Sequence, residues 1–250
     1  AIEYDFLPPV QIQPTFETTT VEGLYLAGQI CGTSGYEEAA GQGLLAGINA
    51  VMKLRNEAPF LLDRGEAYLG VLADDLCVLS PEEPYRMFTS SAEYRLLLRH
   101  DNADTRLMHK GVELGLVPES AGEKAKAKQA AVTEAPAMLE KKYSDGKHLL
   151  SLLRRPGTSA GDLFDRAPEL QTLPGDVLEG LEIDAKYGGY IKRQQNEVEK
   201  MRRWETKRLS QDFDYMSLAP MRREAREKLN RVKPVSIAQA RRIAGVRPAD

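Results

Sequence analysis

The sequence predicts a mixed, mainly α-helical protein in which a short α/β segment precedes an all-helical C-terminal region. Three observations predict this class. Short β-like pieces over residues 10–27 lead through a glycine-rich loop into a small-residue helix over residues 37–54. Leucines recur at helical spacing over residues 69–79, and a long helical pattern runs from residue 177 to about 207.

Composition sets the class of protein. The 250 residues are 42% apolar, which is enough for a buried core. No run approaches the roughly 18 apolar residues of a membrane span, and no signal segment opens the chain, so we expect a cytoplasmic protein without membrane contact. Because the chain starts without methionine and stops at "RPAD", we interpret it as a piece of a longer protein.

Charge is distributed unevenly along the chain. The net charge is −3, yet residues 1–50 hold six acidic and no basic side chains. Residues 222–247 hold nine Lys or Arg against Glu224 and Glu227. A locally basic C-terminal region suits a polyanionic partner such as a nucleic acid.

The glycines of the first helix need an explanation. Gly41, Gly43 and Gly47 each cost roughly 1 kcal/mol relative to alanine inside a helix. Either the helix and its preceding loop form a cofactor cradle, or the helix packs tightly on a sheet without a ligand. The sequence pattern leaves both interpretations open.

The residues after the loop limit the kind of ligand. Gly35 is followed by Tyr36, Glu37 and Glu38, so the lysine of a phosphate-binding P-loop is missing. The free N–H groups at the helix N-terminus instead suit a partial negative charge, such as the N1/C2 oxygen edge of a reduced flavin.

The other elements follow in order. Residues 119–148 are rich in Ala, Lys and Glu and are interrupted by Pro136, which predicts a solvated helical arm or a mobile segment. Turn residues over 154–176 separate this arm from the long helix. The predicted buried face of the long helix comprises Ile183, Tyr187, Ile191, Val198 and Met201.

Two short helices are predicted in the tail. The first ends at Lys233-Pro234, and Ser236 is a candidate N-cap for the second, with Gly245 as its C′ residue. The apolar positions that mark the first are Met221, Ala225, Leu229 and Val232.

Four unusual motifs follow one another along the chain, "GLYLAGQICGTSGYEEAAGQGLLAGINA", "LGVLADDLC", "EPYRMFTSSAEYRLLLRHDNADTRL" and "KYGGYIKRQQNEVEKM". In this order they resemble the C-terminal part of the MnmG (GidA) family of tRNA uridine 5-carboxymethylaminomethyl modification enzymes. The resemblance implies a homodimeric flavoprotein that, with the GTPase MnmE, modifies C5 of the wobble uridine in certain tRNAs. It further implies FAD as the cofactor, with NADH and methylene-tetrahydrofolate as co-substrates.

The resemblance also implies a division of the chain. Residues 1–60 correspond to the C-terminal part of an FAD-binding domain, 61–165 to a helical and mixed connecting region, and 166–250 to a helical domain for tRNA and MnmE. The residues implied to contact the flavin are Gly28, Gln29, Gly32, Gly35, Tyr36 and Glu37, with Gln29 foremost. The family's Rossmann loop for the ADP half of FAD has no counterpart in this sequence, so we expect this chain alone to bind FAD weakly or not at all and to be inactive.

Basic residues mark the predicted tRNA contacts. In the segment 93–107, arginines beside Tyr94 suit phosphate contacts with base stacking, and ion pairs with acidic neighbours are the alternative. The family has an arginine where Ser91 stands here. The predicted tRNA-binding residues are Arg95, Arg99, Arg106, Lys192, Arg193, Arg202, Arg203, Arg231 and Arg241, and the acidic neighbours are Glu93, Asp101 and Asp104.

No catalytic residue or metal site is assigned. The histidines lie far apart without ligand spacing. Cys77 lies in an apolar helical run and is interpreted as inert, and Cys31 in the glycine loop remains an outside candidate for a reactive thiol. Asp75 is interpreted as structural, because its side chain diverges from that of Asp74 on a helix.

Two other functions stay open. A related folate-dependent flavoprotein that methylates tRNA uridine resembles the glycine motif but lacks the long C-terminal helical region. Alternatively, the chain acts only as a non-catalytic module that binds tRNA and the GTPase.

Overall fold

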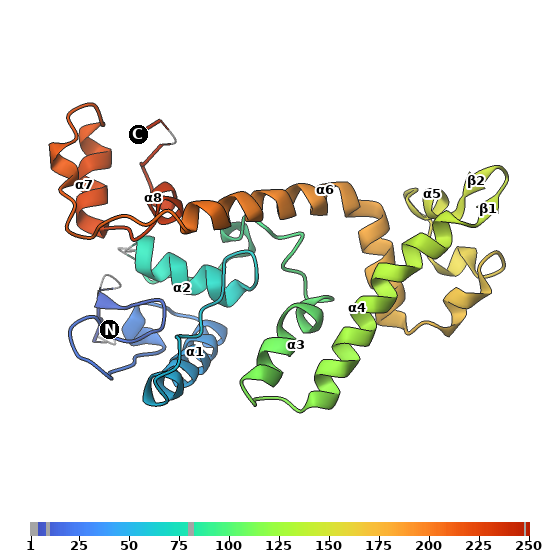
Figure 1. Ribbon diagram of the computed structural model, residues 1–250, viewed down its shortest axis with the longest axis horizontal. Coiled ribbons are helices and arrows are strands. Elements are labelled where there is room, and N and C mark those ends of the chain that lie inside the picture. Colours follow the sequence, from blue (N-terminus) through green and yellow to red (C-terminus); the bar gives the residue numbers. More distant parts are fainter. Residues whose placement is uncertain (1–4, 9–10, 80–82, 248) are drawn as a thin grey trace. The chain divides into compact units, whose positions relative to one another are not determined.

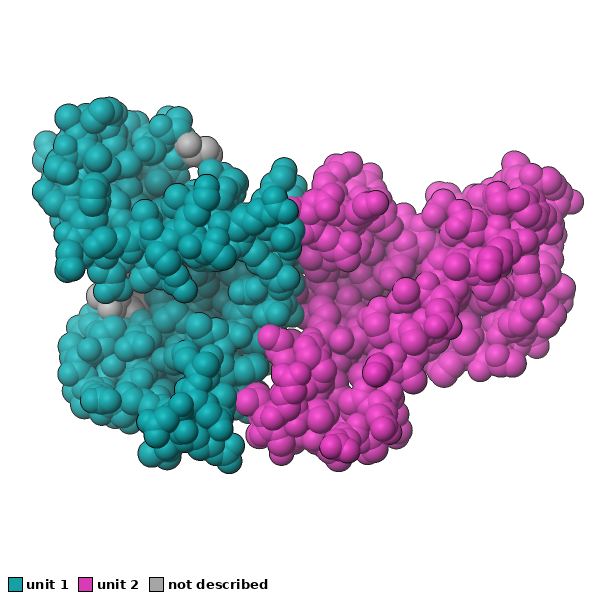
Figure 2. All heavy atoms as spheres, viewed as in Figure 1, with its two compact units in different colours: residues 1–94, 197–250 teal, residues 95–196 magenta. Residues whose placement is uncertain are grey.

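The computed structural model describes residues 5–8, 11–79, 83–247 and 249–250. The chain forms two compact units (Figure 2). Unit 1 contains residues 1–94 and 197–250, and unit 2 contains residues 95–196. These units divide the chain at positions other than the predicted 60/61 and 165/166, and the functional labels given to the three segments stay predictions.

The first half of unit 1 is built around two helices that lie side by side, α1 (Tyr36–Leu54) and α2 (Tyr68–Leu79) (Figure 1). Before them, the predicted β-like pieces form isolated bridges, Ile12 with Thr18 and Glu17 with Tyr25, and the loop contains the 3-10 turn η2 (Gln29–Cys31). The core between these elements includes Phe16, Cys31, Leu45, Leu72 and Leu76. The predicted leucine stripe of α2 is thus confirmed at Leu72 and Leu76, and the side chain of Leu79 lies outside the described part.

The glycines of α1 have different surroundings. A Cβ added to Gly41 would lie 2.2 Å from Cδ2 of Leu69 on α2, so this glycine permits close helix packing. A Cβ on Gly43 or Gly47 would meet nothing within 4 Å. The packing interpretation therefore explains Gly41, and contacts within the described chain do not explain the other two.

Gly70, in the first turn of α2, lies against the backbone of the segment that precedes the helix. A Cβ there would lie 2.4 Å from the backbone carbonyl oxygen of Asp63 and 2.5 Å from that of Leu62. We expect Gly70→Ala to lower the free energy of unfolding by about 1–3 kcal/mol, because backbone rather than a flexible side chain must move. Gly47→Ala should raise it by roughly 0.5–1 kcal/mol. Urea denaturation of both variants checks this, and losses of equal size would contradict it.

The tail completes unit 1. Val78, Tyr215, Leu229 and Ile243 form a second core, which joins the tail to the end of α2. The elements outside the first half are η3 (Thr89–Ser91), the C-terminal part of α6 (Gly175–Glu205), η6 (Tyr215–Ser217), α7 (Arg223–Val232) and α8 (Ile237–Arg242).

The predicted ends of the tail helices are largely confirmed. Lys233 follows α7 in the left-handed conformation, with φ of 50°. The hydroxyl of Ser236 accepts a hydrogen bond of 3.0 Å from the N–H of Gln239 and so caps α8. The prediction for Gly245 is wrong by one residue: α8 has Ile243 as its C-cap, and the turn with φ of 90° comes two positions later.

Unit 2 contains a helix hairpin and a leucine-rich core. Leu139, Leu149, Leu163, Leu170 and Leu181 are among the fully buried residues of that core. The sheet, β1 with β2, is antiparallel and pairs Tyr143 with His148. The elements are α3 (Ala103–Glu113), α4 (Glu119–Glu140), β1 (Tyr143–Ser144), β2 (Lys147–His148), α5 (Leu149–Leu153), η4 (Gly161–Leu163), η5 (Pro168–Thr172) and the N-terminal part of α6.

Three expectations for unit 2 need correction. Pro136 does not interrupt α4, which continues through it to Glu140, and the neighbouring Ala135 is buried in the core rather than solvated. The turn-rich segment 154–176 contributes Leu163 and Leu170 to the same core. Along α6, the predicted face is wrong at Tyr187, which is 47% exposed, while its other four members are half-buried. The fully buried positions are Val177, Gly180, Leu181 and Ala185. The prediction of a mainly α-helical protein is nevertheless confirmed.

Candidate functional site

The loop before α1 adopts backbone conformations that favour glycine. Gly28 has φ of 87° and Gly32 has φ of 81°, both in the region that L side chains rarely adopt. A Cβ on Gly32 would also lie 2.6 Å from Cε2 of Phe6. Glycine at these two positions therefore follows from the path of the loop.

A buried glutamine on α1 holds this loop. The Oε1 atom of Gln42 accepts a hydrogen bond of 2.8 Å from the N–H of Gly28, and its Nε2 atom donates one of 2.8 Å to Oγ1 of Thr33. The Thr33 hydroxyl in turn donates to the carbonyl oxygen of Gly28 at 3.2 Å. All three residues are buried, so each bond is protected from water and fixes the loop against the helix.

Sequence reasoning missed this clamp. The available signal was a polar residue, Gln42, directly after the glycine that faces α2, on the inner side of the helix. A buried amide on a helix needs hydrogen-bond partners. The glycine loop was the nearest element that could supply them.

Residues 85–87 hold the other side of the loop. The N–H of Tyr85 donates to the carbonyl oxygen of Gly32 at 2.7 Å, and the N–H of Ser34 donates to that of Tyr85 at 3.2 Å. The carboxylate of buried Glu38 accepts from the N–H of Met87 at 2.9 Å. Glu38, although in the first turn of α1, therefore has a structural role.

The predicted flavin-contacting residues divide into two groups. Gly28, Gly32 and Gly35 shape the backbone, and Gly35 is the N-cap of α1. The side chains of Gln29, Tyr36 and Glu37 are exposed, and that of Tyr36 is 93% exposed. Gln29 thus lies in the loop itself, in η2, whereas Tyr36 and Glu37 lie in the first turn of α1.

The two cysteines are not activated. Burial raises the pKa of Cys31 to about 11. Burial and the nearby carboxylate of Asp74 raise the pKa of Cys77 to about 12. Since a thiolate is the nucleophile, neither side chain is suited to attack at neutral pH, and the outside candidacy of Cys31 is not supported.

A buried network of charges joins segments of unit 1 that are far apart in sequence. The guanidinium of Arg64 bonds to the carboxylates of Asp75, Asp74 at 3.1 Å and Glu93 at 2.9 Å. Burial opposes the charge of Arg64, but the three carboxylates outweigh burial and raise its pKa. The hydroxyl of Tyr85 donates to Asp75 at 2.7 Å, which confirms the structural interpretation of Asp75.

The tail supplies the second cation of this network. Arg242 on α8 lies 2.7 Å from the carboxylate of Asp74 and 2.8 Å from that of Glu205. Burial raises the pKa of Asp74 even though Arg242 and Arg64 favour its charged form. The carboxylate of Glu205 also accepts a hydrogen bond from Ser236, so the start and end of α8 are both attached to the network.

The segment 93–107 does not present the predicted stacking residue. Tyr94 is only 6% exposed, so the expectation that a base stacks on it is wrong. Arg99 pairs with Asp101 at 2.9 Å and Asp184 at 3.2 Å, as the ion-pair alternative predicts. Arg106 donates to the side chain of Asn102 at 2.9 Å, and Arg95 is exposed.

The basic residues of α6 and the tail are largely accessible. The guanidinium carbon of Arg193 lies 5.5 Å from the ring centroid of Tyr190, and that of Arg241 lies 4.1 Å from that of Trp204. The remaining residues predicted to contact tRNA are also exposed, and two of them, Arg202 and Arg203, form ion pairs at the surface. They are Lys192, Arg202, Arg203 and Arg231.

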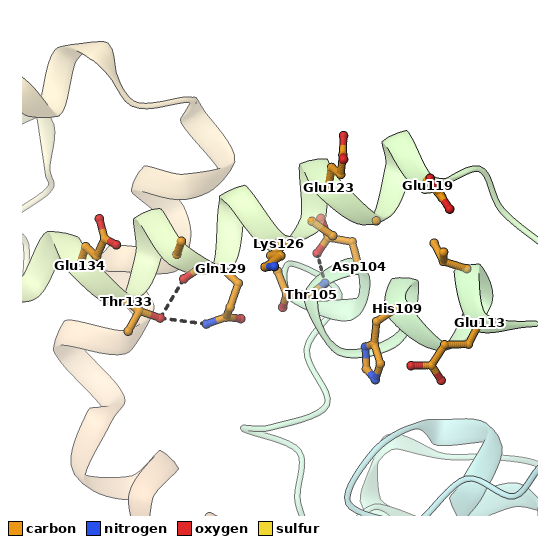
Figure 3. Close-up of a pocket in the computed structure, with 14 residues that line it drawn as sticks. Asp104, Thr105, His109, Glu113, Glu119, Glu123, Lys126, Gln129, Thr133 and Glu134 are labelled. Carbon is orange, nitrogen blue, oxygen red and sulfur yellow. Dashed lines mark hydrogen bonds between the residues drawn. The ribbon is translucent and has the colours of Figure 1, made fainter.

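A pocket of about 740 Å³ lies between α3 and α4 (Figure 3). Its acidic lining residues include Glu113, Glu119, Glu123 and Glu134, and His109 of α3 also lines it. No group of His, Cys, Asp and Glu within the described residues has the arrangement of a metal site. Among those residues, too, none of the helices is long and apolar enough to cross a bilayer.

Three family models match the chain. Residues 1–58 match glucose inhibited division protein A. Residues 119–195 match the C-terminal helical domain of the tRNA modifying enzyme MnmG/GidA, and residues 197–250 match its C-terminal helical bundle. The second match ends at residue 195 and the third begins at residue 197, which is where unit 2 ends and the second stretch of unit 1 begins.

Known proteins resemble the whole chain. It is 46% identical to the tRNA uridine 5-carboxymethylaminomethyl modification enzymes MnmG of Latilactobacillus sakei and Enterococcus faecalis, across 100% of this chain and 43% of each relative. The solved structure of Aquifex aeolicus GidA superposes with a TM-score of 0.82 and 37% identity, over 98% of this chain and 41% of that one. The chain spans less than half the length of these relatives. With three matching models in the family's order, it belongs to the MnmG/GidA family.

Proposed function

We propose that this chain is part of a flavin-dependent, cytoplasmic tRNA-modifying enzyme. Together with the GTPase MnmE, the enzyme installs the carboxymethylaminomethyl group at C5 of the wobble uridine. The observation that carries the proposal is the 46% identity, across 100% of this chain, to enzymes named for that modification. The clamped glycine loop and the basic tail support it with a cofactor element and an RNA surface.

The glycine loop fits one edge of a flavin ring. Gly28 and Gly32 keep bulk away from the backbone, and Gln42 fixes the backbone in place. The exposed side chain of Gln29 and the N-terminus of α1 supply donors suited to a partial negative charge. The glycine loop would hold the flavin, and the bound FAD would supply hydride acceptance from NADH and reducing equivalents for the uridine, with methylene-tetrahydrofolate as the carbon donor. In this scheme Gln29 orients the pyrimidine edge of the flavin, while the exposed Tyr36 and Glu37 border it.

The helical C-terminal region favours this family over the folate-dependent tRNA methyltransferase. That alternative shares the glycine motif but lacks the long helical region, and residues 119–195 and 197–250 here match MnmG/GidA helical models. A non-catalytic module for tRNA and MnmE is the remaining alternative. Flavin absorbance in the purified chain would argue against that module and against our expectation of weak FAD binding.

The tRNA surface is assigned to accessible basic residues. Arg99 is less suited to it, since its charge is already matched by Asp101 and Asp184. Docking of MnmE and pairing into a homodimer are part of the proposal. Because Arg242 belongs to a buried charge network, substitutions on the exposed side of α7 test MnmE docking better than deletion of the tail.

The chain is expected to bind tRNA with strong salt dependence. Each phosphate contact contributes a slope of about −0.7 to −0.9 to a plot of log affinity against log salt. Replacing Lys192, Arg203 and Arg231 together with glutamine should therefore flatten the slope by about 2 to 3. Gel retardation at several salt concentrations measures this.

The matched control replaces three exposed lysines of unit 2, Lys124, Lys141 and Lys147, with glutamine and removes the same charge. Its slope should equal that of the parent chain. Absence of any tRNA complex at low salt would reject the proposed tRNA surface.

A further inference from the structure

A second, smaller pocket on unit 2 has the composition of a nucleotide site. It encloses about 500 Å³ against α6 and the end of α5. Three of its seven lining residues are cations, one is a tyrosine, and none is a carboxylate. They are Arg154, Ala185, Lys186, Gly188, Gly189, Tyr190 and Arg193.

The cations converge on this pocket from two elements. Lys186, Tyr190 and Arg193 are spaced i, i+4 and i+7 on α6 and so lie on one face of that helix. Arg154 is the C-cap residue of α5 and lines the pocket with them. Lys186 has an ion pair with Glu182 at 3.3 Å. Neither Arg154 nor Arg193 has an ion pair with a carboxylate in the part of the chain that the structure describes.

Tyr190 offers an accessible aromatic surface. The residue is 58% exposed, and the guanidinium carbon of Arg193 lies 5.5 Å from its ring centroid. A guanidinium plane and a tyrosine ring are both surfaces on which an unpaired base stacks. A simple anion would need the charges but not the ring.

The paired glycines beside Tyr190 are not explained by packing within the chain. Gly188 and Gly189 lie inside the continuous helix α6, where glycine lowers helix stability relative to alanine. A Cβ on either would meet nothing within 4 Å. Both residues line the pocket, so their missing side chains leave room for a ligand to approach the helix backbone.

We propose that this pocket binds one unpaired nucleotide of single-stranded RNA. The base stacks on Tyr190, and the phosphates on its two sides contact Arg154, Lys186 and Arg193. Duplex RNA fits this combination poorly, since its bases stack on one another and leave none for the tyrosine. The inference rests on the proposed tRNA function and assigns to it a site that reads an unpaired loop.

The aromatic contact is tested with two labelled RNAs, a stem–loop and a duplex of the same stem, and the full 250-residue chain. Tyr190→Ala should weaken binding of the stem–loop by about 5- to 150-fold and leave duplex binding unchanged. Tyr187→Ala is the matched control, because Tyr187 is 47% exposed on the same helix but does not line the pocket. Its stem–loop affinity should equal that of the parent.

The charges and the glycines provide independent tests. Replacing Arg154, Lys186 and Arg193 with glutamine should flatten the salt slope for the stem–loop by about 2, against no change for the Lys124, Lys141 and Lys147 control. Gly189→Ala should raise Tm and yet weaken stem–loop binding. Loss of folding cannot produce that combination.

The outcomes separate this inference from the proposed function. If the parent chain binds both RNAs and Tyr190→Ala binds the stem–loop as tightly as Tyr187→Ala does, the nucleotide pocket is overturned and the basic tRNA surface stands. If Gly189→Ala binds the stem–loop as tightly as the parent does, the RNA does not approach the backbone of α6 closely. If the parent binds neither RNA at low salt, the pocket and the proposed tRNA function are both overturned.

Discussion

Arg64→Met is expected to lower the free energy of unfolding by about 3–5 kcal/mol, because it removes the cation shared by buried Asp75, half-buried Asp74 and the more exposed Glu93. The side chain of Arg64 is 13% exposed and contacts Asp74, Asp75 and Glu93. Methionine fills much of the same space but offers no donor. The remaining cation of the network, Arg242, already pairs with Asp74 and Glu205.

The loss should depend on pH. In the parent chain, burial opposes the charge of Glu93, but Arg64 outweighs burial and lowers its pKa. Stability from this carboxylate is therefore present above its ordinary value of 4.5 and is lost as pH falls. Without Arg64 the carboxylates are left to repel one another, so the deficit of Arg64→Met should shrink as pH falls and the carboxylates take up protons.

Urea denaturation at several pH values measures both effects, with an unchanged m-value expected. Arg202→Met is the matched control, since Arg202 pairs with Asp63 while its side chain is 50% exposed, and it should lose less than about 1 kcal/mol. Asp75→Asn combined with Arg64→Met should recover part of the loss. Equal losses for Arg64→Met and Arg202→Met would contradict a buried charge network.

Gln42→Ala is expected to cost about 2–4 kcal/mol, through a buried donor left without its acceptor and a cavity in its place. The N–H of Gly28 loses the acceptor Oε1, and Thr33 loses the donor Nε2. The loop should open more often than the rest of unit 1. Faster amide hydrogen exchange at Gly28, beyond the change in global stability, would report that opening.

Gly43→Ala is the control for this substitution. Gly43 is the next residue on α1 but faces open space, so alanine should stabilise the helix by roughly 0.5–1 kcal/mol without affecting the loop. If Gln42→Ala leaves the exchange rate at Gly28 as it is in the parent, the clamp is not what holds the loop. If the glycine loop holds FAD as we propose, a loosened loop should weaken FAD binding in the whole enzyme.

Local patterns predicted the helices well. The predicted ranges 37–54, 69–79 and 177–207 correspond to α1 (Tyr36–Leu54), α2 (Tyr68–Leu79) and α6 (Gly175–Glu205). Periodicity and capping residues act over one or two helical turns, so they are legible in sequence. The cap at Ser236 belongs to the same class of signal.

Long-range contacts were not predictable in this way. The burial of Tyr94 depends on how distant segments pack, and the partners of Arg64 lie up to 29 positions away. Leu163 and Leu170 belong to short 3-10 turns without a period, so their place in a core had no local signal. The clamp formed by Gln42 was missed for the same reason, because its partners Thr33 and Gly28 lie in a loop 9 and 14 positions earlier.

The interleaved layout of unit 1 has a consequence for synthesis on the ribosome. Asp74 and its cation Arg242 lie 168 positions apart, with all of unit 2 between them. During translation, Arg64 can pair with Asp74 early, but the second cation of this network is added only after Arg242 emerges. Unit 2, being continuous, can complete its leucine core first, so the nascent chain matures from its middle outward.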